Sequence, residues 1–257
     1  MKSSIIVWLL MVSTVFGSAL QLGNDIDGEA SSDSSGESVA LSSDGSIVAI
    51  GATRNYGNGD SSGHVRLYQW TGSSWNQLGN DIDGEASNDH FGYSVSLSSD
   101  GSIVAIGARN NDGNGDSSGH VRLYQWDGIS WSQLGSDIDG EASGDFSGYS
   151  VALSSDGSIV AIGAPYNDGN GNVSGHVRLY QWDGSTWNQL GDDIDGEAVN
   201  NYSGSSFALS ADGSIVAIGA HNNNGNGVKS GHVRLYQWTG SSWNQLGNDI
   251  DGEASND

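Results

Sequence analysis

The chain has 257 residues, of which 40 are Gly, one is Pro and none is Cys, and its formal net charge at pH 7 is −23. This acidic balance argues against nucleic acid as a partner, because phosphate backbones are bound by basic surfaces. The lack of Cys excludes disulfides, so the fold must be held by its core, by stacking of repeats or by bound metal.

The first predicted element is a secretory signal peptide at residues 1–19. One Lys is followed by an apolar run over residues 5–16 and by small residues at 17–19, which is the pattern of such a peptide. The run is short for a membrane span, and no later segment is apolar enough to cross a bilayer. We expect a secreted or cell-surface protein with no transmembrane segment after cleavage, with an uncleaved anchor as the alternative.

A 56-residue repeat fills residues 20–257. Complete units begin at Gln21, Gln77, Gln133 and Gln189, and a partial fifth begins at Gln245. In the first unit, residues 38–42, 46–52, 63–70 and 74–82 alternate or run apolar at strand length between Gly-, Asp- and Asn-rich corners. Four strands per unit in tandem predict an all-β fold, a β-propeller of four-stranded antiparallel blades.

The number of blades is less certain than their type. Residues 20–26 resemble the fourth strand of a unit, and residues 242–250 close the fourth complete unit with another such strand. One fourth strand is therefore spare. We expect either that it completes a blade whose other strands are absent or that the chain is a fragment of a larger ring, and the abrupt ending favours the fragment.

The third predicted strand carries the motif SGHVRLYQW, which occurs four times. Side chains alternate along a strand, so His64, Arg66 and Tyr68 share one side, and stacked blades cover both sides. A buried Arg needs a carboxylate, and Asp81 or Asp83 is near enough to supply one. We interpret the repeated His as a structural hydrogen-bonding residue, because the unit has no second His or Cys at ligand spacing.

Two Trp residues follow in every unit, at Trp70 and Trp75 in the first. Exposed, such a pair could stack on a sugar, as in propeller lectins. Strand-borne Trp between blades also buries a large area. Core packing is the favoured interpretation.

The unit resembles the FG-GAP repeats of integrin α-chain headpieces, and more closely those of secreted microbial and algal proteins. Residues 91–108, FGYSVSLSSDGSIVAIGA, contain Phe91-Gly92, and Gly163, Ala164 and Pro165 preserve the GAP triplet. The resemblance implies a β-propeller used for extracellular recognition, often with calcium. The family's calcium loop joins the first two strands, and here that loop is only SSDGS, so its calcium sites cannot be transferred.

Calcium is instead predicted at the DIDGEA corners. Carboxylates separated by a sharp Gly turn resemble part of a calcium loop, although an Asx-type turn that also supplies a partner for the Arg is an equal alternative. The candidate ligands are Asp81, Asp83, Glu85, Asp89, Asp137, Asp139, Glu141 and Asp145.

Two loops differ between units that are otherwise nearly identical. In an antiparallel blade the loop after the second strand and the crossing before the first strand lie at the same end, so the variation falls on one face. Loops on a rigid scaffold are common sites of recognition. The candidate binding residues on this face are Arg54, Tyr56, His90, Phe91, Arg109, Phe146, Tyr166, Tyr202 and His221, and Asn172 and Asn201 are candidate glycan acceptors.

No catalytic constellation is predicted. Residues able to do acid–base or nucleophilic work recur in every unit, whereas a catalytic site usually needs one asymmetric set. We therefore expect a non-catalytic extracellular recognition or adhesion module that binds an unknown protein or glycan, with calcium as the expected cofactor. The alternatives are a glycan-binding propeller lectin, a Gly/Asp-rich β-solenoid adhesin, and the non-catalytic part of a larger secreted hydrolase.

Overall fold

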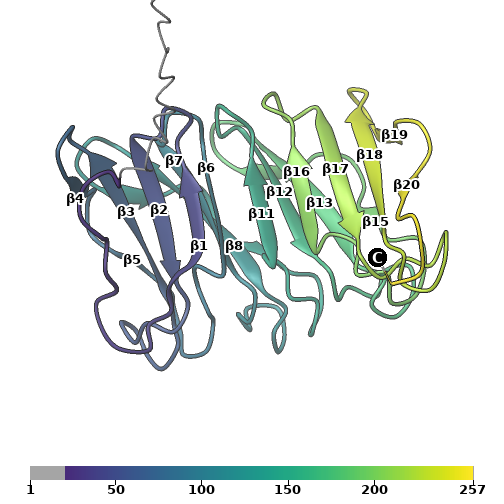
Figure 1. Ribbon diagram of the computed structural model, residues 1–257, viewed down its shortest axis with the longest axis horizontal. Coiled ribbons are helices and arrows are strands. Elements are labelled where there is room, and N and C mark those ends of the chain that lie inside the picture. The colour runs from purple at the N-terminus through teal and green to yellow at the C-terminus, as the bar shows by residue number, and fades with distance from the viewer. Residues whose placement is uncertain (1–20, 257) are drawn as a thin grey trace, which may run out of the picture.

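The computed structural model describes residues 21–256 and contains twenty strands in four sheets. Figure 1 shows the sheets side by side, with the first and last at opposite ends of the molecule. No helix among the described residues is long and apolar enough to cross a membrane. The predicted signal peptide, residues 1–19, lies outside the described residues.

Each sheet is one blade, and its strands pair in chain order from the inside outwards. The innermost strands, which contact their counterparts in the next blade, are β1 (Ser35–Leu41), β6 (Ser94–Leu97), β11 (Ser150–Leu153) and β16 (Ser206–Leu209). The second strands are β2 (Ile47–Ala52), β7 (Ile103–Ala108), β12 (Ile159–Ala164) and β17 (Ile215–Ala220). Tight Asp-Gly turns join each first strand to the second, as predicted for so short a connection.

The third strand is the repeated HVRLYQW segment. It forms β3 (His64–Trp70), β8 (His120–Trp126), β13 (His176–Trp182) and β18 (His232–Trp238). In β3, Val65 and Leu67 on one side and His64 and Arg66 on the other are all buried. The prediction that both sides of this strand are covered is confirmed.

The fourth strand is interrupted, which the sequence did not indicate. Its two pieces are β4 (Trp75–Gln77) with β5 (Ile82–Asp83), β9 (Trp131–Gln133) with β10 (Ile138–Asp139), β14 (Trp187–Gln189) with β15 (Ile194–Asp195), and β19 (Trp243–Gln245) with β20 (Ile250–Asp251). Both pieces pair with the third strand. Between them Gly79 adopts a positive φ of 79°, a conformation that interrupts an extended strand.

The core lies between blades rather than within any one of them. Ile47, Val65 and Leu67 of the first blade pack with Val104 and Ile106 of the second, and the next two boundaries repeat this arrangement. Each fully buried aliphatic side chain contributes about 1.5–3 kcal/mol of transfer free energy. Stacking therefore provides the core that a chain without disulfides requires.

The four blades do not close into a ring. Val39 on the first blade and Ile250 on the last are 64% and 60% exposed. Ile82, which occupies the position of Ile250 in the first blade, is only 5% exposed because the next blade covers it. The fold class is therefore an all-β propeller whose blades form an incomplete ring.

The spare fourth strand forms no strand in residues 21–34, yet it occupies the place of one. The indole of Trp75 donates a 3.0 Å hydrogen bond to the carbonyl of Leu22, and Trp131 of the second blade donates equivalently to Leu78. The segment thus packs against the first blade as a preceding blade's outer edge would. Without its own third strand to pair with, it forms no ladder.

Candidate functional site

The two variable loops meet at one end of each blade, as predicted. The backbone N–H of Arg54 donates to the carbonyl of Asp33 at 3.1 Å, and the Asn55 amide donates to the Asp33 carboxylate at 3.2 Å. The second blade repeats the contact between Asn110 and Asp89. These bonds join the loop after the second strand to the crossing that enters the blade, and we call this surface the loop face.

Several positions in these loops have a left-handed backbone, and one of them carries a ring in three blades. Ser34, His90, Phe146 and Tyr202 occupy it in the four blades, with φ of 58°, 54°, 54° and 55°. Such left-handed conformations are uncommon for bulky residues, and they are concentrated at functional sites where the surrounding structure enforces them. Three blades therefore place a ring at a position that favours a small residue.

The rings of the loop face form a continuous band across the second, third and fourth blades. Tyr93 lies 5.1 Å from Tyr149, Phe146 lies 5.0 Å from Tyr166, and Tyr166 lies 5.3 Å from Tyr202, measured between ring centroids. The remaining contacts, Tyr149 with Tyr166 and Tyr202 with His221, complete the row. We call these six residues the aromatic band.

Arg109 joins the start of the band as a cation. Its guanidinium carbon lies 3.8 Å from the ring centroid of Tyr93 and 5.6 Å from that of Tyr149, within range of a cation–π contact. Burial and then the hydrogen bond with Tyr149 raise the pKa of Tyr93 to about 12, against the opposing charge of Arg109. The phenol is therefore neutral at physiological pH and able to donate or accept a hydrogen bond.

The candidates on this face separate into three groups. Arg109, Phe146, Tyr166, Tyr202 and His221 belong to the band or contact it. The side chains of Arg54 and Tyr56 are exposed on the first blade, and His90 is half-buried, with its pKa lowered by burial and by Arg109.

Phe91 does not belong to the exposed surface. Its ring is 0% exposed and packs in the core between the first two blades, at 6.5 Å from Tyr124. Tyr93 and Tyr149, which the sequence analysis missed, are in the band instead. The residue at this position differs between units, since Glu37 and Ser205 occupy the equivalent places. That variation could have identified the position as part of the loop face.

The two candidate glycan acceptors differ in accessibility. The side chain of Asn172 is exposed, which suits the prediction. Asn201 is 2% exposed, and its carbonyl oxygen accepts hydrogen bonds from the backbone of Ala198 and from Asn223. A glycan on Asn201 would disrupt the loop, so this candidate is corrected to a structural residue.

The predicted calcium ligands do not converge within a unit. Asp89 and Asp145 are buried and hold loops, since each accepts hydrogen bonds from a backbone N–H and an Asn side chain. Asp81 turns towards the His of its own blade, whereas Glu85 reaches forward to the next. Among residues 21–256 no cluster of potential metal ligands contains Asp83 or Asp139, and burial raises the pKa of Asp83.

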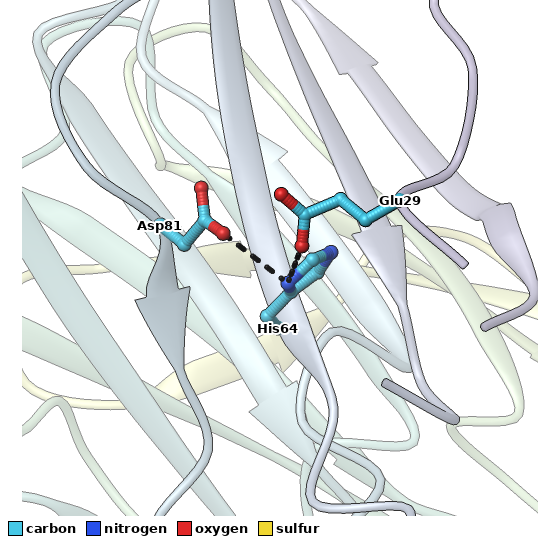
Figure 2. A group of neighbouring side chains, drawn as sticks. All are labelled: Glu29, His64 and Asp81. Carbon is cyan, nitrogen blue, oxygen red and sulfur yellow. Dashed lines mark ion pairs between the residues drawn. The ribbon is translucent and has the colours of Figure 1, made fainter. Parts of the chain in front are cut away.

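A different cluster occurs at the entry to every blade. His64 on β3 lies between Asp81 of the same blade and Glu29 of the preceding segment (Figure 2). The His64 Nδ1 atom is 3.7 Å from Asp81 Oδ2 and 3.8 Å from Glu29 Oε2. The equivalent clusters are Glu85, His120 and Asp137, then Glu141, His176 and Asp193, then Glu197, His232 and Asp249. Each combines donor atoms that could hold a metal ion.

These His residues are not the hydrogen-bonding residues that the sequence suggested. Their side chains are 1% exposed, and Nδ1 of His64, His176 and His232 has no hydrogen-bond partner among the described residues. Burial lowers the pKa of His64 and His232, and burial with Arg178 lowers that of His176 to about 4. Neutral imidazoles therefore face pairs of carboxylates across gaps too long for hydrogen bonds.

The repeated Arg beside each His has a partner, though not always the predicted one. Arg66 Nη1 is 3.8 Å from the other oxygen of Glu29, and Nη2 donates to the Asp27 carbonyl at 2.7 Å. Arg122 instead bonds Asp137 through Nε and Nη2 at 3.0 and 2.9 Å and also contacts Glu85. An Asp of the predicted type is thus the partner in the second blade, and a Glu from the segment that precedes the blade is the partner in the first.

The Trp pairs pack at the outer rim of the blade boundaries. Trp126 and Trp131 lie 5.3 Å apart and cover Gly79 of the preceding blade. Trp131 and Tyr124, with Asp81 and Asp83, line a pocket of about 250 Å³, and the next two boundaries have pockets of about 320 and 260 Å³. The same Trp rings therefore pack against the preceding blade and form one wall of a partly open pocket.

Residues 82–124 and 137–180 match the FG-GAP repeat family. Both matched stretches are similar to FG-GAP repeats. The two matched stretches run from the outer edge of one blade to the third strand of the next, and the other units share their sequence. The resemblance seen in Phe91-Gly92 and in the GAP triplet is confirmed.

Solved structures resemble this chain at low identity. Hydrazine synthase of Kuenenia stuttgartiensis has a TM-score of 0.56 at 11% identity, covering 90% of this chain and 53% of that chain. The periplasmic gluconolactonase PpgL of Pseudomonas aeruginosa has a TM-score of 0.56 at 15% identity, covering 83% and 56%. The β-propeller domain of Myceliophteria thermophila Cps50 (Swd1) has a TM-score of 0.49 at 11% identity, covering 82% and 56%.

These similarities extend to the fold alone, and the chain spans little more than half the length of the matched structures. No curated protein matches the chain in sequence.

The expectation that the chain is not an enzyme requires correction. It shares its fold with a protein named as a gluconolactonase, so a propeller of repeated blades does not exclude catalysis. Fold and function are separable, and an active site can be built from loops that differ between blades. The loops of this chain do differ, and its enzyme status is not established.

Proposed function

We propose that this FG-GAP repeat protein is an extracellular recognition or adhesion module that binds a protein or glycan partner through the loop face. The observation that carries this proposal is the aromatic band. Loops from three blades, nearly identical elsewhere, differ where they contribute Tyr93, Phe146, Tyr149, Tyr166 and Tyr202. Neutral variation would scatter such substitutions, whereas here the rings meet in one row.

The band has the chemistry of a contact surface. Tyr and Arg are enriched among the residues that dominate binding energy, and Tyr supplies contact area at low conformational entropy cost. Tyr166 is 38% exposed and Arg109 is half-buried, so the rings are accessible but already held by their neighbours. A partner would therefore meet a surface that needs little ordering.

The extracellular assignment is supported by the signal-peptide pattern of residues 1–19 and by the acidic composition. Calcium assistance belongs to the same proposal, with the exposed Asp83 and Asp139 corners as its remaining candidate ligands. Protein recovered from the medium should lack residues 1–19 by intact mass, and a retained Met1 would contradict export.

A second candidate is glycan binding at the outer rim. The observation in its favour is the pocket repeated at three blade boundaries, where an indole, a phenol and two carboxylates converge. A sugar can stack on an aromatic ring while carboxylates accept its hydroxyl hydrogens. This alternative uses residues that repeat, whereas the loop face uses residues that differ.

The test compares binding of residues 20–257 to intact cells and to a glycan microarray. We expect the double variant Tyr166→Ala with Tyr202→Ala to lose at least tenfold in cell binding, because each ring supplies buried contact area. Ser73→Ala with Ser74→Ala, on the opposite face, is the matched control and should bind as the parent does. Thermal melting measures folding of each variant.

The outcomes separate the candidates. Loss of binding on replacing Trp131 and Trp187 by Phe, with the Tyr variants unaffected, would favour the rim pockets. If the Tyr variants bind both the cells and the glycan microarray as the parent does, the loop face is rejected as the binding surface.

A further inference from the structure

The entries to three of the blades place a buried imidazole nitrogen in front of two carboxylates. Nδ1 of His64, His176 and His232 lies 3.5–3.8 Å from one oxygen of a Glu and one of an Asp. At each boundary the three candidate donor atoms lie within 4.8 Å of one another. Two negatively charged carboxylates close to a buried nitrogen that has no hydrogen-bond partner are energetically unfavourable unless a cation or a proton lies between them.

The spacing fits a small tetrahedral ion. Ligands bound at about 2.1 Å in a tetrahedron lie about 3.4 Å from one another, so the nitrogen–oxygen gaps would close by only a few tenths of an ångström, and the two carboxylate oxygens lie within 4.8 Å of each other. Hydrogen bonds between the same atoms would require gaps shorter than about 3.2 Å. The atoms are thus arranged as donors around a common centre rather than as hydrogen-bonding partners.

We propose that these three boundaries each bind a divalent transition-metal ion of the Zn²⁺ class, through one His nitrogen and one oxygen from each of the two carboxylates. The sites are Glu29, His64 and Asp81, then Glu141, His176 and Asp193, then Glu197, His232 and Asp249. Imidazole favours zinc and its neighbours, whereas calcium takes oxygen ligands only. Three protein ligands leave the fourth position to water, which the partly exposed carboxylates admit.

The Arg residues organise these sites without occupying them. Arg66, Arg178 and Arg234 each place Nη1 3.5–3.8 Å from the second oxygen of the same Glu, and each donates to the backbone carbonyl of the Asp two residues before that Glu. Outer contacts of this kind fix the orientation of a ligating carboxylate. The Glu oxygen nearest the imidazole also accepts a 3.5 Å hydrogen bond from Asn167 at Glu141 and from Asn223 at Glu197, and a carboxylate oxygen has a second lone pair for an ion.

The entry to the second blade differs from the other three and serves as an internal comparison. Arg122 there contacts Glu85 and bonds both oxygens of Asp137, so a guanidinium already neutralises the carboxylates that would bind an ion. Binding there requires the Arg to withdraw. We expect tight binding of three ions rather than four.

The ion would join successive blades. In each site the Glu precedes the blade, whereas the His and Asp belong to it, so coordination ties two parts of the chain across a boundary. At the first site it would hold residues 21–34 on the first blade. A protein without disulfides would gain a cross-link at each of these boundaries. Because the ion would bind only the folded state, it would raise the free energy of unfolding.

The test uses the folded chain stripped with a chelator, re-equilibrated with ZnCl₂ and freed of loose ions by gel filtration. We expect about three retained equivalents, and a loss of about one in each of Glu29→Gln, Glu141→Gln and Glu197→Gln. Gln keeps the size of Glu and an acceptor for the Arg but loses the charge. The matched control is Glu253→Gln, because Glu253 has the same motif but no following blade within residues 21–256, and it should retain all three.

Two further measurements make the result decisive. Micromolar Zn²⁺ should raise the melting temperature of the parent and of Glu253→Gln, but not of the triple Glu variant, while millimolar Ca²⁺ or Mg²⁺ should not replace it. Cobalt(II) added to the unaltered chain should give the intense visible bands of a tetrahedral centre. Equal zinc retention by the parent and the triple variant, displacement by calcium, or octahedral cobalt bands only would overturn the proposal.

Discussion

The loop face and the blade boundaries are built from the same repeat but follow opposite rules. At the boundaries the residues recur unchanged, as with His64, His120, His176 and His232, because every blade must stack on the next. On the loop face the equivalent positions differ, as with Ser34, His90, Phe146 and Tyr202. Repetition therefore identifies what the stack requires, and variation identifies what the stack leaves free.

The comparison also explains how a repeated fold can carry one site. A boundary contact is available three times among the described blades, so a ligand using it would bind in several copies. The aromatic band exists once, because none of its positions carries an aromatic residue in all four blades. Position-specific recognition is thus compatible with near-identical units.

The largest expected effect comes from Phe91, which the sequence placed on the loop face and the structure places in the core between two blades, although the equivalent residues are Ser35, Ser147 and Ser203. Phe91→Ala should lower the free energy of unfolding by about 3–5 kcal/mol, because it empties a fully buried site between blades. Phe146→Ala, its neighbour in the equivalent loop of the next blade, should cost about 1 kcal/mol through lost ring contacts. Urea unfolding followed by Trp fluorescence measures both.

A similar loss for the two variants would show that the band is packing rather than surface. It would remove the distinction between the two regions on which the proposed function depends.

A smaller effect should distinguish a boundary from the open end of the stack. Gly79 and Gly247 occupy the same motif with φ of 79° and 71°. A Cβ at Gly79 would meet the Trp126 ring at 2.7 Å, whereas one at Gly247 meets nothing within 4 Å. Gly247→Ala should cost only the left-handed backbone penalty of about 1–2 kcal/mol. Gly79→Ala should add an overpacking penalty of about 1–3 kcal/mol.

If chemical denaturation gives equal losses of unfolding free energy for the two variants, the Trp pair moves aside easily and contributes little to blade stacking. A cost at Gly247 as large as predicted for Gly79 would indicate that something covers the last blade in solution.

Much of the fold could be predicted from the sequence because its signals are local. The 56-residue period, the Asp-Gly turns and the apolar alternation define strands such as β2, expected over 46–52 and found at Ile47–Ala52. The break in the fourth strand was missed because the Leu-Gly-Asn sequence reads equally well as strand or turn. The break recurs in the last blade, where Gly247 has a φ of 71° and a Cβ would meet nothing within 4 Å, so the glycine conformation rather than a following blade interrupts the strand.

The site was less predictable, for two physical reasons. Phe91 and Phe146 appear in loops of similar sequence, but Phe146 has a left-handed backbone whereas Phe91 is the residue after one, so their rings point in opposite directions. The Glu, His and Asp clusters join residues from different units. No spacing within one unit reveals them, because stacking alone brings them together.

The smallest predicted effect tests a third kind of position, repeated but exposed, at the turns opposite the loop face. The backbone N–H of Ser46 and the Ser46 and Ser42 hydroxyls lower the pKa of Asp44 from its ordinary 3.8 to about 2, and Asp212 is held at about 2 by the equivalent Ser210 and Ser214 contacts. A carboxyl whose pKa is lower in the folded state stabilises that state above its unfolded pKa. The contribution should be complete at pH 7 and disappear as the pH falls from about 4 to about 2.

Asp44→Asn with Asp212→Asn should therefore be slightly less stable than the parent at pH 7 and equal to it near pH 2. A difference that stays constant over this range in thermal melting would mean that the turn depends on the shape of the side chain rather than on its charge, and repetition at this face would then reflect turn geometry alone.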